Sequence, residues 1–431
     1  MSTPPEIRPS TVETPAAPQP RVPFDLFLSP QRGWFRALRH PNFRLFWTGN
    51  FVSNIGSWMQ NVAQGWLVYQ LTDSPLWLGL VGFAQQVPSL VFSLPGGLLA
   101  DRVSRRRVLL TTQTLMMLIA VTLAALVTFR VVTVEHILLL AFLAGTVMAL
   151  NAPNHQAAVR DLVQAEDTLN AIALNSIQFN FSRVLGPSVA GFIIAAAGVA
   201  ACFYLNALSY VALLLVLARV QFPPHQEQEA HSLSSAVAES FRYIWVERHI
   251  LILISLVALV STFGLPYLVM MPAFARDVLH VGARGYGYLV ACAGLGALGG
   301  GIWLARRESH HRRGPVVLTA ALLFFTAVLA FSLSGHAVLS GALLAVVGAS
   351  LVNCVATVNS LVQTIVPDRI RGRILSLHTM AFLGFTPLGS LLVGALAERS
   401  SPPMALALSS GFALALTAVI AFAAPAIRRL Q

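Results

Sequence analysis

Residues 96–110 read GGLLADRVSRRRVLL, so that one acid and four arginines stand between two apolar runs. Only 10 % of the chain is charged, whereas 56 % is hydrophobic and the mean hydropathy is +0.71. Apolar runs of about 20 residues are typical of helices that cross a bilayer. We therefore expect this charged stretch to be a short loop between two membrane spans.

Twelve apolar runs of this length occur along the chain, six before a polar stretch at 220–248 and six after it. The two halves resemble each other, because a single shift places Gly97 on Gly300 and Gly186 on Gly389. The pattern predicts an all-α membrane protein with twelve transmembrane helices in two pseudo-symmetric six-helix bundles, at 43–219 and 249–425.

The remaining segments are polar and basic. Residues 1–42 are rich in proline and contain no apolar core of a signal peptide, which predicts a disordered cytoplasmic tail. Residues 220–248 and 426–431 are expected to be a cytoplasmic central loop and a short cytoplasmic tail. The arginines gather before the first span, in the even-numbered loops and at the C-terminus, so the positive-inside rule places both termini in the cytoplasm. The net charge of +11 then arises from the arginines of the cytoplasmic segments, and nucleic-acid binding is not expected.

The stretch GLLADRVSRRR at 97–107 resembles the loop 2–3 signature of the major facilitator superfamily, with Ser104 where the signature has glycine. The similarity extends over about 42–425, and spans one and two resemble the branch of enterobactin exporters and macrolide-efflux proteins. The resemblance implies a monomeric, non-enzymatic exporter in the bacterial cytoplasmic membrane. It would move a drug, siderophore or metabolite by alternating access in exchange for protons, with no cofactor and no metal.

The resemblance also implies a role for the charged loop as a conformational latch. Asp101 would pair with Arg371 or Arg373 when the cytoplasmic side closes, and the pair would break when that side opens. Topology alone would explain the arginines but not Asp101. The expected latch residues are Gly97, Asp101, Arg102, Arg105, Arg106, Arg371 and Arg373.

A second signature lies in span five. The stretch SRVLGPSVAG at 182–191 is similar to the antiporter motif of the superfamily. Small residues let two helices approach closely, and a proline bends a span and frees a carbonyl. The resemblance implies a seal between the two halves, and ordinary tight packing is the alternative. The expected motif residues are Ser182, Gly186, Pro187 and Gly191.

Polar side chains form stripes on three spans, and the stripe on span one lies within about 80° at 100° per residue. Because amides in lipid need partners, we expect these stripes to face a substrate cavity, or else to join helices. The expected cavity residues are Asn50, Asn54, Asn61, Gln64, Asn175, Gln178, Arg183, Asn353 and Thr357. Weaker lining candidates are Gln85, Gln86, Asn151, Asn154, His155 and His378.

Arg183 is the one formal charge deep in a predicted span, and all acids lie outside the spans. An arginine at that depth needs water, carbonyls or an anion. Either it attracts an anionic or polyhydroxylated substrate or acts in coupling, or it is a structural residue bonded to carbonyls near Pro187. Proton exchange is implied by the resemblance alone, because Asp101, Asp161, His155 and His378, which could carry a proton, all lie near span ends.

The sequence is also compatible with two other functions. A lysophospholipid or metabolite transporter would share the spans and the polar stripes. A membrane sensor that transports nothing is the second alternative, but the central stretch at 220–248 is too short for a soluble sensor domain.

Overall fold

The structure is a computed structural model that describes residues 33, 35–222, 247–306, 313–424 and 427–430. Side chains at 93–102, 368, 369, 373 and 429 lie outside the described part. Within that part every regular element is a helix. Eleven helical segments are long and apolar enough to cross a membrane. The 32-residue helix α1, whose amide side chains lower its hydropathy, completes a set of twelve spans.

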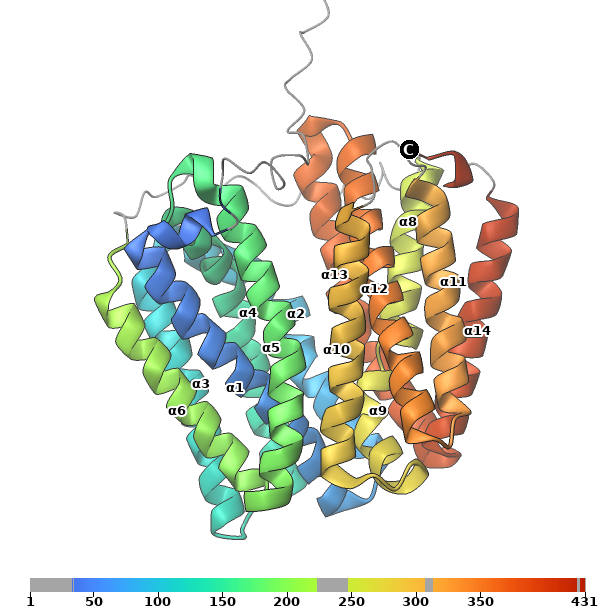
Figure 1. The fold of residues 1–431 in the computed structure, drawn as a ribbon, viewed down its shortest axis with the longest axis horizontal. Helices are drawn as coiled ribbons and strands as arrows, with labels where there is room; N and C mark the ends of the chain where they lie inside the picture. The colour runs from blue at the N-terminus through green and yellow to red at the C-terminus, as the bar shows by residue number, and fades with distance from the viewer. Residues whose placement is uncertain (1–32, 34, 223–246, 307–312, 425–426, 431) are drawn as a thin grey trace, which may run out of the picture.

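Six helices form the first group, on the left in Figure 1. Their bounds are α1 Pro41–Thr72, α2 Pro75–Arg102, α3 Arg105–Thr128, α4 Val134–Asp161, α5 Thr168–Ala197 and α6 Val199–Arg219. The short helices η2 Arg36–Arg39 and η3 Ala165–Asp167 lie beside them. Residues 36–42, which the sequence pattern assigns to a disordered tail, thus contain η2 and the start of α1.

The second group, on the right in Figure 1, begins with an interrupted span. It consists of α8 Arg248–Leu259, the π-helix η4 Val260–Gly264, α9 Tyr267–Ala273 and the π-helix η5 Phe274–Val278. The helices that follow are α10 Gly282–Arg306, α11 Arg313–Ser332, α12 Ala337–Ile365, α13 Asp368–Arg399 and α14 Pro402–Ala423, with η6 Ile427–Arg429 at the end. The predicted limits of the two bundles remain predictions.

The two ends of the molecule differ. The start of α1 and the end of α14 lie at one end, the top in Figure 1, which we call the terminal side. The opposite end, the far side, holds the α1–α2 connection and η5. The two groups lie closer together towards the far side, and the helix pairs α2–α13 and α5–α10 join them.

Two local features determine where particular helices end and begin. Asp73 has a left-handed backbone (φ 50°), which ends α1, and Pro75 begins α2 two residues later. Gly264 and Pro266 interrupt the first span of the second group, where the Leu265 N–H donates to the Val260 carbonyl over a π turn. Tyr267 therefore begins a new helical segment.

Candidate functional site

A cavity of about 430 Å³ lies between the two groups of helices, and we call it the central cavity. Helix α1 contributes a row of polar and aromatic side chains, and α2 contributes Gln85 and Gln86. The second group contributes Leu268, Val269 and Pro272 from α9, together with Tyr286 and Val290 from α10. The residues from α1 include Ser57, Trp58, Gln60, Asn61 and Gln64.

A second cavity of about 240 Å³ lies within the first group, and we call it the amide cavity. Ser57, Met116, Met148 and Tyr210 line both cavities, so the two adjoin. The other side chains of the amide cavity come from α1, α3, α4, α5 and α6, and most are polar. They include Asn50, Ser53, Asn54, Gln113, Asn151, His155, Gln156, Asn175 and Phe179.

Hydrogen bonds orient several of these polar side chains. Gln85 Nε2 donates to Asn61 Oδ1 at 3.2 Å, which connects α2 to α1. Ser57 Oγ donates to a backbone carbonyl of its own helix, so the Tyr210 hydroxyl, 3.0 Å away, donates to Ser57. These contacts fix donors and acceptors before a ligand arrives, which reduces the entropy cost of binding.

The lining of the central cavity is asymmetric. The amides come from the first group, whereas the second group offers apolar surface and the phenol of Tyr286. The ring of Tyr286 stacks on Trp66 with centroids 6.2 Å apart. A molecule in this cavity would therefore meet hydrogen-bonding groups on one side and apolar and aromatic surface on the other.

The structure brings some of the expected cavity residues to the two cavities and leaves others elsewhere. Those that line a cavity are Asn50, Asn54, Asn61, Gln64 and Asn175. Those that line neither are Gln178, Arg183, Asn353 and Thr357. Gln178 is buried, and within the described residues both polar atoms of its amide lack a hydrogen-bond partner. Of the weaker candidates, Gln85, Gln86, Asn151 and His155 line a cavity, whereas Asn154 and His378 do not.

Arg183 lies beside the central cavity. Its guanidinium carbon is 5.7 Å from the ring centroid of Trp58, which lines that cavity. Arg183 also interacts electrostatically with Tyr267, the first residue of α9. The hydroxyl of Tyr267 is buried, and Arg183 is the charged group that interacts with it. Arg183 thus lies where the first group meets the interrupted span of the second.

The residues at 182–191 lie against two neighbouring helices. A Cβ added at Gly186 would lie 2.5 Å from Trp58 Cβ on α1, and one added at Gly191 would lie 2.9 Å from the Ala283 carbonyl oxygen of α10. Ser182 Oγ donates to the Phe51 carbonyl of α1 at 3.5 Å. This stretch of α5 therefore packs on its own group and on the opposite group.

The expected latch lies mostly outside the described side chains. The side chains of Asp101, Arg102 and Arg373, and the surroundings of Gly97, are not described. Arg105 pairs with Asp161, at the end of α4, and Arg106 Nη2 donates to the Ala218 carbonyl of α6 at 2.6 Å. Both arginines therefore interact within the first group on the terminal side.

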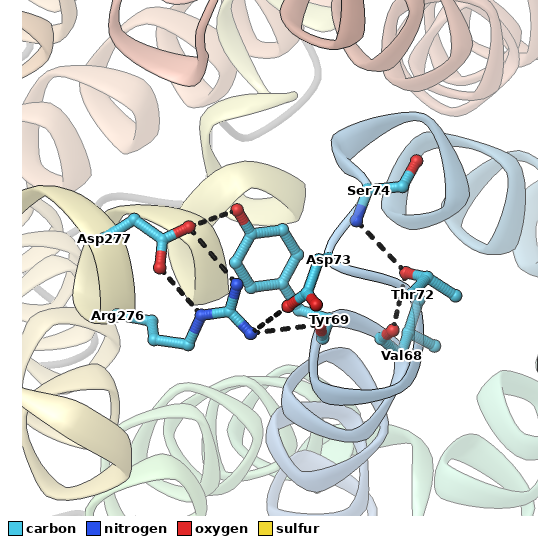
Figure 2. A network of polar contacts seen from close by, with 7 residues as sticks. All are labelled: Val68, Tyr69, Thr72, Asp73, Ser74, Arg276 and Asp277. Carbon is cyan, nitrogen blue, oxygen red and sulfur yellow. Dashed lines mark hydrogen bonds and ion pairs between the residues drawn. The ribbon is translucent and has the colours of Figure 1, made fainter.

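A polar cluster on the far side joins the two groups, and the sequence pattern did not predict it. Figure 2 shows Tyr69 and Asp73 at the end of α1 facing Arg276 and Asp277 of η5. Arg276 Nη1 lies 2.6 Å from Asp73 Oδ1, and Arg276 Nε donates to Asp277 Oδ1 at 2.7 Å. The Tyr69 hydroxyl donates to Asp277, and the Arg276 guanidinium lies over the Tyr69 ring at 4.1 Å. We call these four residues the far-side cluster.

A second far-side contact lies at the start of α2. Glu398, at the end of α13, accepts hydrogen bonds from Ser74 Oγ at 2.7 Å and from the Leu76 N–H at 3.2 Å. A carboxylate is favourable at a helix N-terminus, because the unpaired N–H groups and the helix dipole attract negative charge. Here the carboxylate comes from the opposite group, so this contact also holds the far side together.

The side chains that line the two cavities offer hydrogen-bonding groups for a bound molecule. No three His, Cys, Asp or Glu side chains lie together within the described part of the chain in a way that would hold a metal ion. The ionisable groups among the cavity-lining residues are His155 and tyrosines. The arrangement can select a molecule by hydrogen bonding and shape.

Comparisons with known proteins agree with this architecture. The chain is 24 % identical over 358 residues to the staphyloferrin A transporter of Staphylococcus aureus, covering 82 % of this chain and 89 % of that protein. It is 27 % identical over 382 residues to the enterobactin exporter EntS of Shigella flexneri, covering 88 % and 91 %. Its fold is similar to that of the nucleoside transporter NupG, with a TM-score of 0.69 and 14 % identity over 90 % of this chain and 100 % of that one.

The family assignment rests on almost the whole chain. The sequence model described as "Transmembrane secretion effector" matches residues 32–430, which include all the described helices. The predicted fold class is confirmed, because the helices, the cavity between two groups and the similar structures all agree. The chain belongs to the transmembrane secretion effector family of the major facilitator superfamily.

Proposed function

We propose that this protein exports a small organic molecule across the bacterial cytoplasmic membrane in exchange for protons. The observation that carries the proposal is the central cavity, which lies between the two groups and is lined by residues of both. Alternating access requires such a site, because each group must contact the substrate while one group moves relative to the other.

Two similar proteins support the direction and the kind of substrate. One is named an enterobactin exporter and another a staphyloferrin A transporter. By this similarity we propose a siderophore-like substrate, rich in hydroxyl or carboxylate groups. The amides of α1 and α2 would bind its polar groups, and Tyr286 with the apolar residues of α9 would pack against its body.

The size of the site suits this substrate class. The central and amide cavities measure about 430 and 240 Å³. Binding sites for small molecules commonly lie between about 300 and 1,000 Å³. Arg183 would add a positive charge beside Trp58, close enough to favour anionic groups at one edge of the site.

The proposed orientation places the terminal side in the cytoplasm, as the arginine distribution predicts. The far-side cluster and the Glu398 contact would then close the site towards the outside. The described conformation would correspond to the state that receives the substrate from the cytoplasm.

The test is the retention of a compound panel in efflux-deficient bacteria that express the protein. The panel holds cationic, neutral and anionic fluorescent compounds together with catecholates, each with and without a protonophore. Asn61→Leu would remove a hydrogen-bonding side chain of the central cavity, and Asn180→Leu, on α5 and outside both cavities, is the matched control. We expect protein-dependent, protonophore-sensitive loss of anionic compounds with the native protein and the control, and retention with Asn61→Leu. Equal retention with and without a well-inserted native protein contradicts export.

A further inference from the structure

Trp58 of α1 lies at the boundary between the two cavities. It lines the central cavity, and its chain neighbour Ser57 lines both cavities. Its ring packs edge to face with Phe179 of α5, which lines the amide cavity, and the ring centroids are 5.8 Å apart. The Trp58 side chain is half-buried, so part of a large aromatic surface borders the space where a substrate would bind.

Helix α5 makes room for this ring and holds its base. A Cβ added at Gly186 would lie 2.5 Å from Trp58 Cβ and 2.8 Å from the Ile55 carbonyl oxygen. A larger residue could therefore stand at position 186 only if α1 and α5 moved apart. Ser182 Oγ, one turn earlier, donates to the Phe51 carbonyl of α1 at 3.5 Å. The close approach of the two helices thus fixes the Trp58 side chain at its base.

Arg183 places a positive charge over the same ring. Its guanidinium carbon lies over the ring of Trp58, 5.7 Å from the centroid, which is within the range of a cation–π contact. Arg183 and Phe179 are four residues apart on α5 and are therefore neighbours on the surface of that helix. A cation over an aromatic ring draws the π electrons towards itself, so the remaining surface of Trp58 becomes poorer in electrons.

The charges around the two cavities favour one sign of ligand. A tryptophan ring normally attracts cations, because its face carries a negative potential. At Trp58 the charge of Arg183 opposes this attraction. Neither cavity has an aspartate or glutamate among its described lining residues, so a cationic molecule would lack a counter-charge there. An anionic molecule, in contrast, would be attracted by Arg183.

Asn61 adds a hydrogen-bond donor beside the ring. It follows Trp58 by three residues on α1, which makes the two side chains neighbours on the helix surface, and it lines the central cavity. Its Oδ1 accepts a hydrogen bond from Gln85 Nε2 at 3.2 Å. Its Nδ2 makes no hydrogen bond within the described part of the chain, so it can donate to an oxygen of a ring that stacks on Trp58.

We propose that Trp58 is a specificity-determining residue that selects substrates with an anionic, hydroxylated aromatic ring, such as a hydroxybenzoate. This inference rests on the proposed function and narrows its substrate class. The substrate ring stacks on the part of the indole that borders the central cavity, its negative group faces Arg183, and a ring oxygen accepts from Asn61. Aromatic cations bind poorly, because Arg183 repels them and no acid among the described lining residues compensates.

The test is equilibrium binding of radiolabelled probes to the full chain in lipid nanodiscs, without a proton gradient. The probes are 2-hydroxybenzoate, 2-hydroxybenzamide, 2-hydroxybenzylammonium and 2-hydroxycyclohexanecarboxylate, which have similar sizes but differ in charge or aromaticity. We expect the native protein to bind the aromatic anion about tenfold more tightly than the aromatic cation, with the neutral amide between them. Equal or tighter binding of the cation, or no binding of the aromatic anion, overturns the proposal.

Substitutions at Trp58 separate stacking from packing. Trp58→Leu should weaken the binding of 2-hydroxybenzoate by about tenfold and leave that of 2-hydroxycyclohexanecarboxylate nearly unchanged, whereas Trp58→Phe should keep most of the affinity for the aromatic anion. Trp303→Leu, at a half-exposed tryptophan of α10 outside both cavities, is the matched control and should bind as the native protein does. Equal losses for both anions would mean that Trp58 acts only by packing, which overturns the proposal.

Arg183→Gln tests the origin of the preference. The ratio of anion to cation affinity should fall towards one, because glutamine can still form hydrogen bonds near the ring but carries no charge. An unchanged ratio overturns the proposal. Export from cells judges the proposed function separately. Binding with the expected preference but without export contradicts the proposed function alone, whereas export of cationic and anionic aromatic compounds at equal rates overturns the inferred selectivity.

Discussion

Arg276 Nη1 lies 2.6 Å from Asp73 Oδ1, so the end of α1 is tied to η5 of the opposite group. The chain positions are more than 200 residues apart, and the contact forms only because the far side is closed. The Asp73 side chain is 74 % exposed, so its pair with Arg276 is worth about 0.2–1 kcal/mol. Arg276 also binds Asp277 and covers Tyr69, which makes it the centre of the cluster.

Arg276→Ala should therefore favour the state that is open on the far side. Loss of the Asp73 pair alone should change the ratio of far-side-open to far-side-closed protein by up to about fivefold. Loss of the other contacts of Arg276 should increase this change. The measurement is the rate at which a thiol reagent, added from the far side, labels Leu268→Cys in the central cavity. Arg284→Ala, exposed at the start of α10, is the matched control and should leave the rate unchanged. Slower labelling of the Arg276→Ala protein contradicts the role of the cluster.

Gly287→Ala should prevent closure of the far side. An added Cβ at Gly287 would lie 2.4 Å from the Pro187 carbonyl oxygen and 3.1 Å from Gly191 Cα, and neither backbone atom can move away by rotating a side chain. Overpacking of this kind destabilises the closed state by about 1–3 kcal/mol, which changes the ratio of closed to open protein by roughly 5- to 150-fold.

The control for this change is Gly299→Ala on the same helix, where an added Cβ meets nothing within 4 Å. We expect transport by the Gly299→Ala protein to match that of the native protein, and transport by the Gly287→Ala protein to fall while both insert in the membrane at native levels. Native transport by Gly287→Ala would mean that α5 and α10 separate easily at this point.

The membrane spans could be predicted because lipid requires every backbone N–H and C=O group to be bonded within a helix. The polar stripe of α1 could also be predicted, since helical periodicity alone places Asn50, Asn54 and Asn61 on one side. Whether such a side faces a cavity depends on the packing of other helices. Asn353 and Thr357 form the same pattern on α12 but do not line the two cavities.

The far-side cluster could not be predicted from local pattern. Asp73 ends one helix, Arg276 lies in a π turn, and nothing in their immediate sequence connects them. One indication of the cluster was present in the sequence. Charged residues are rare in the loops on this side of the membrane, and a charge near the membrane needs a partner. Similarly, the contact between His155 and Asn50 depends on the direction of the Asn50 amide, which a backbone carbonyl one turn earlier sets.

Arg183→Gln should weaken the transport of anionic compounds more than that of neutral ones. The guanidinium lies over Trp58 at the edge of the central cavity, where it can attract an anion without being paired to a carboxylate within the described residues. A hydrogen bond to a charged group contributes about 1.5–3 kcal/mol, so the apparent affinity for anionic probes should fall by roughly ten- to a hundredfold. The comparison is the concentration dependence of transport for matched anionic and neutral probes in proteoliposomes. An equal loss for both would indicate that Arg183 supports the packing of α5 against Tyr267 instead.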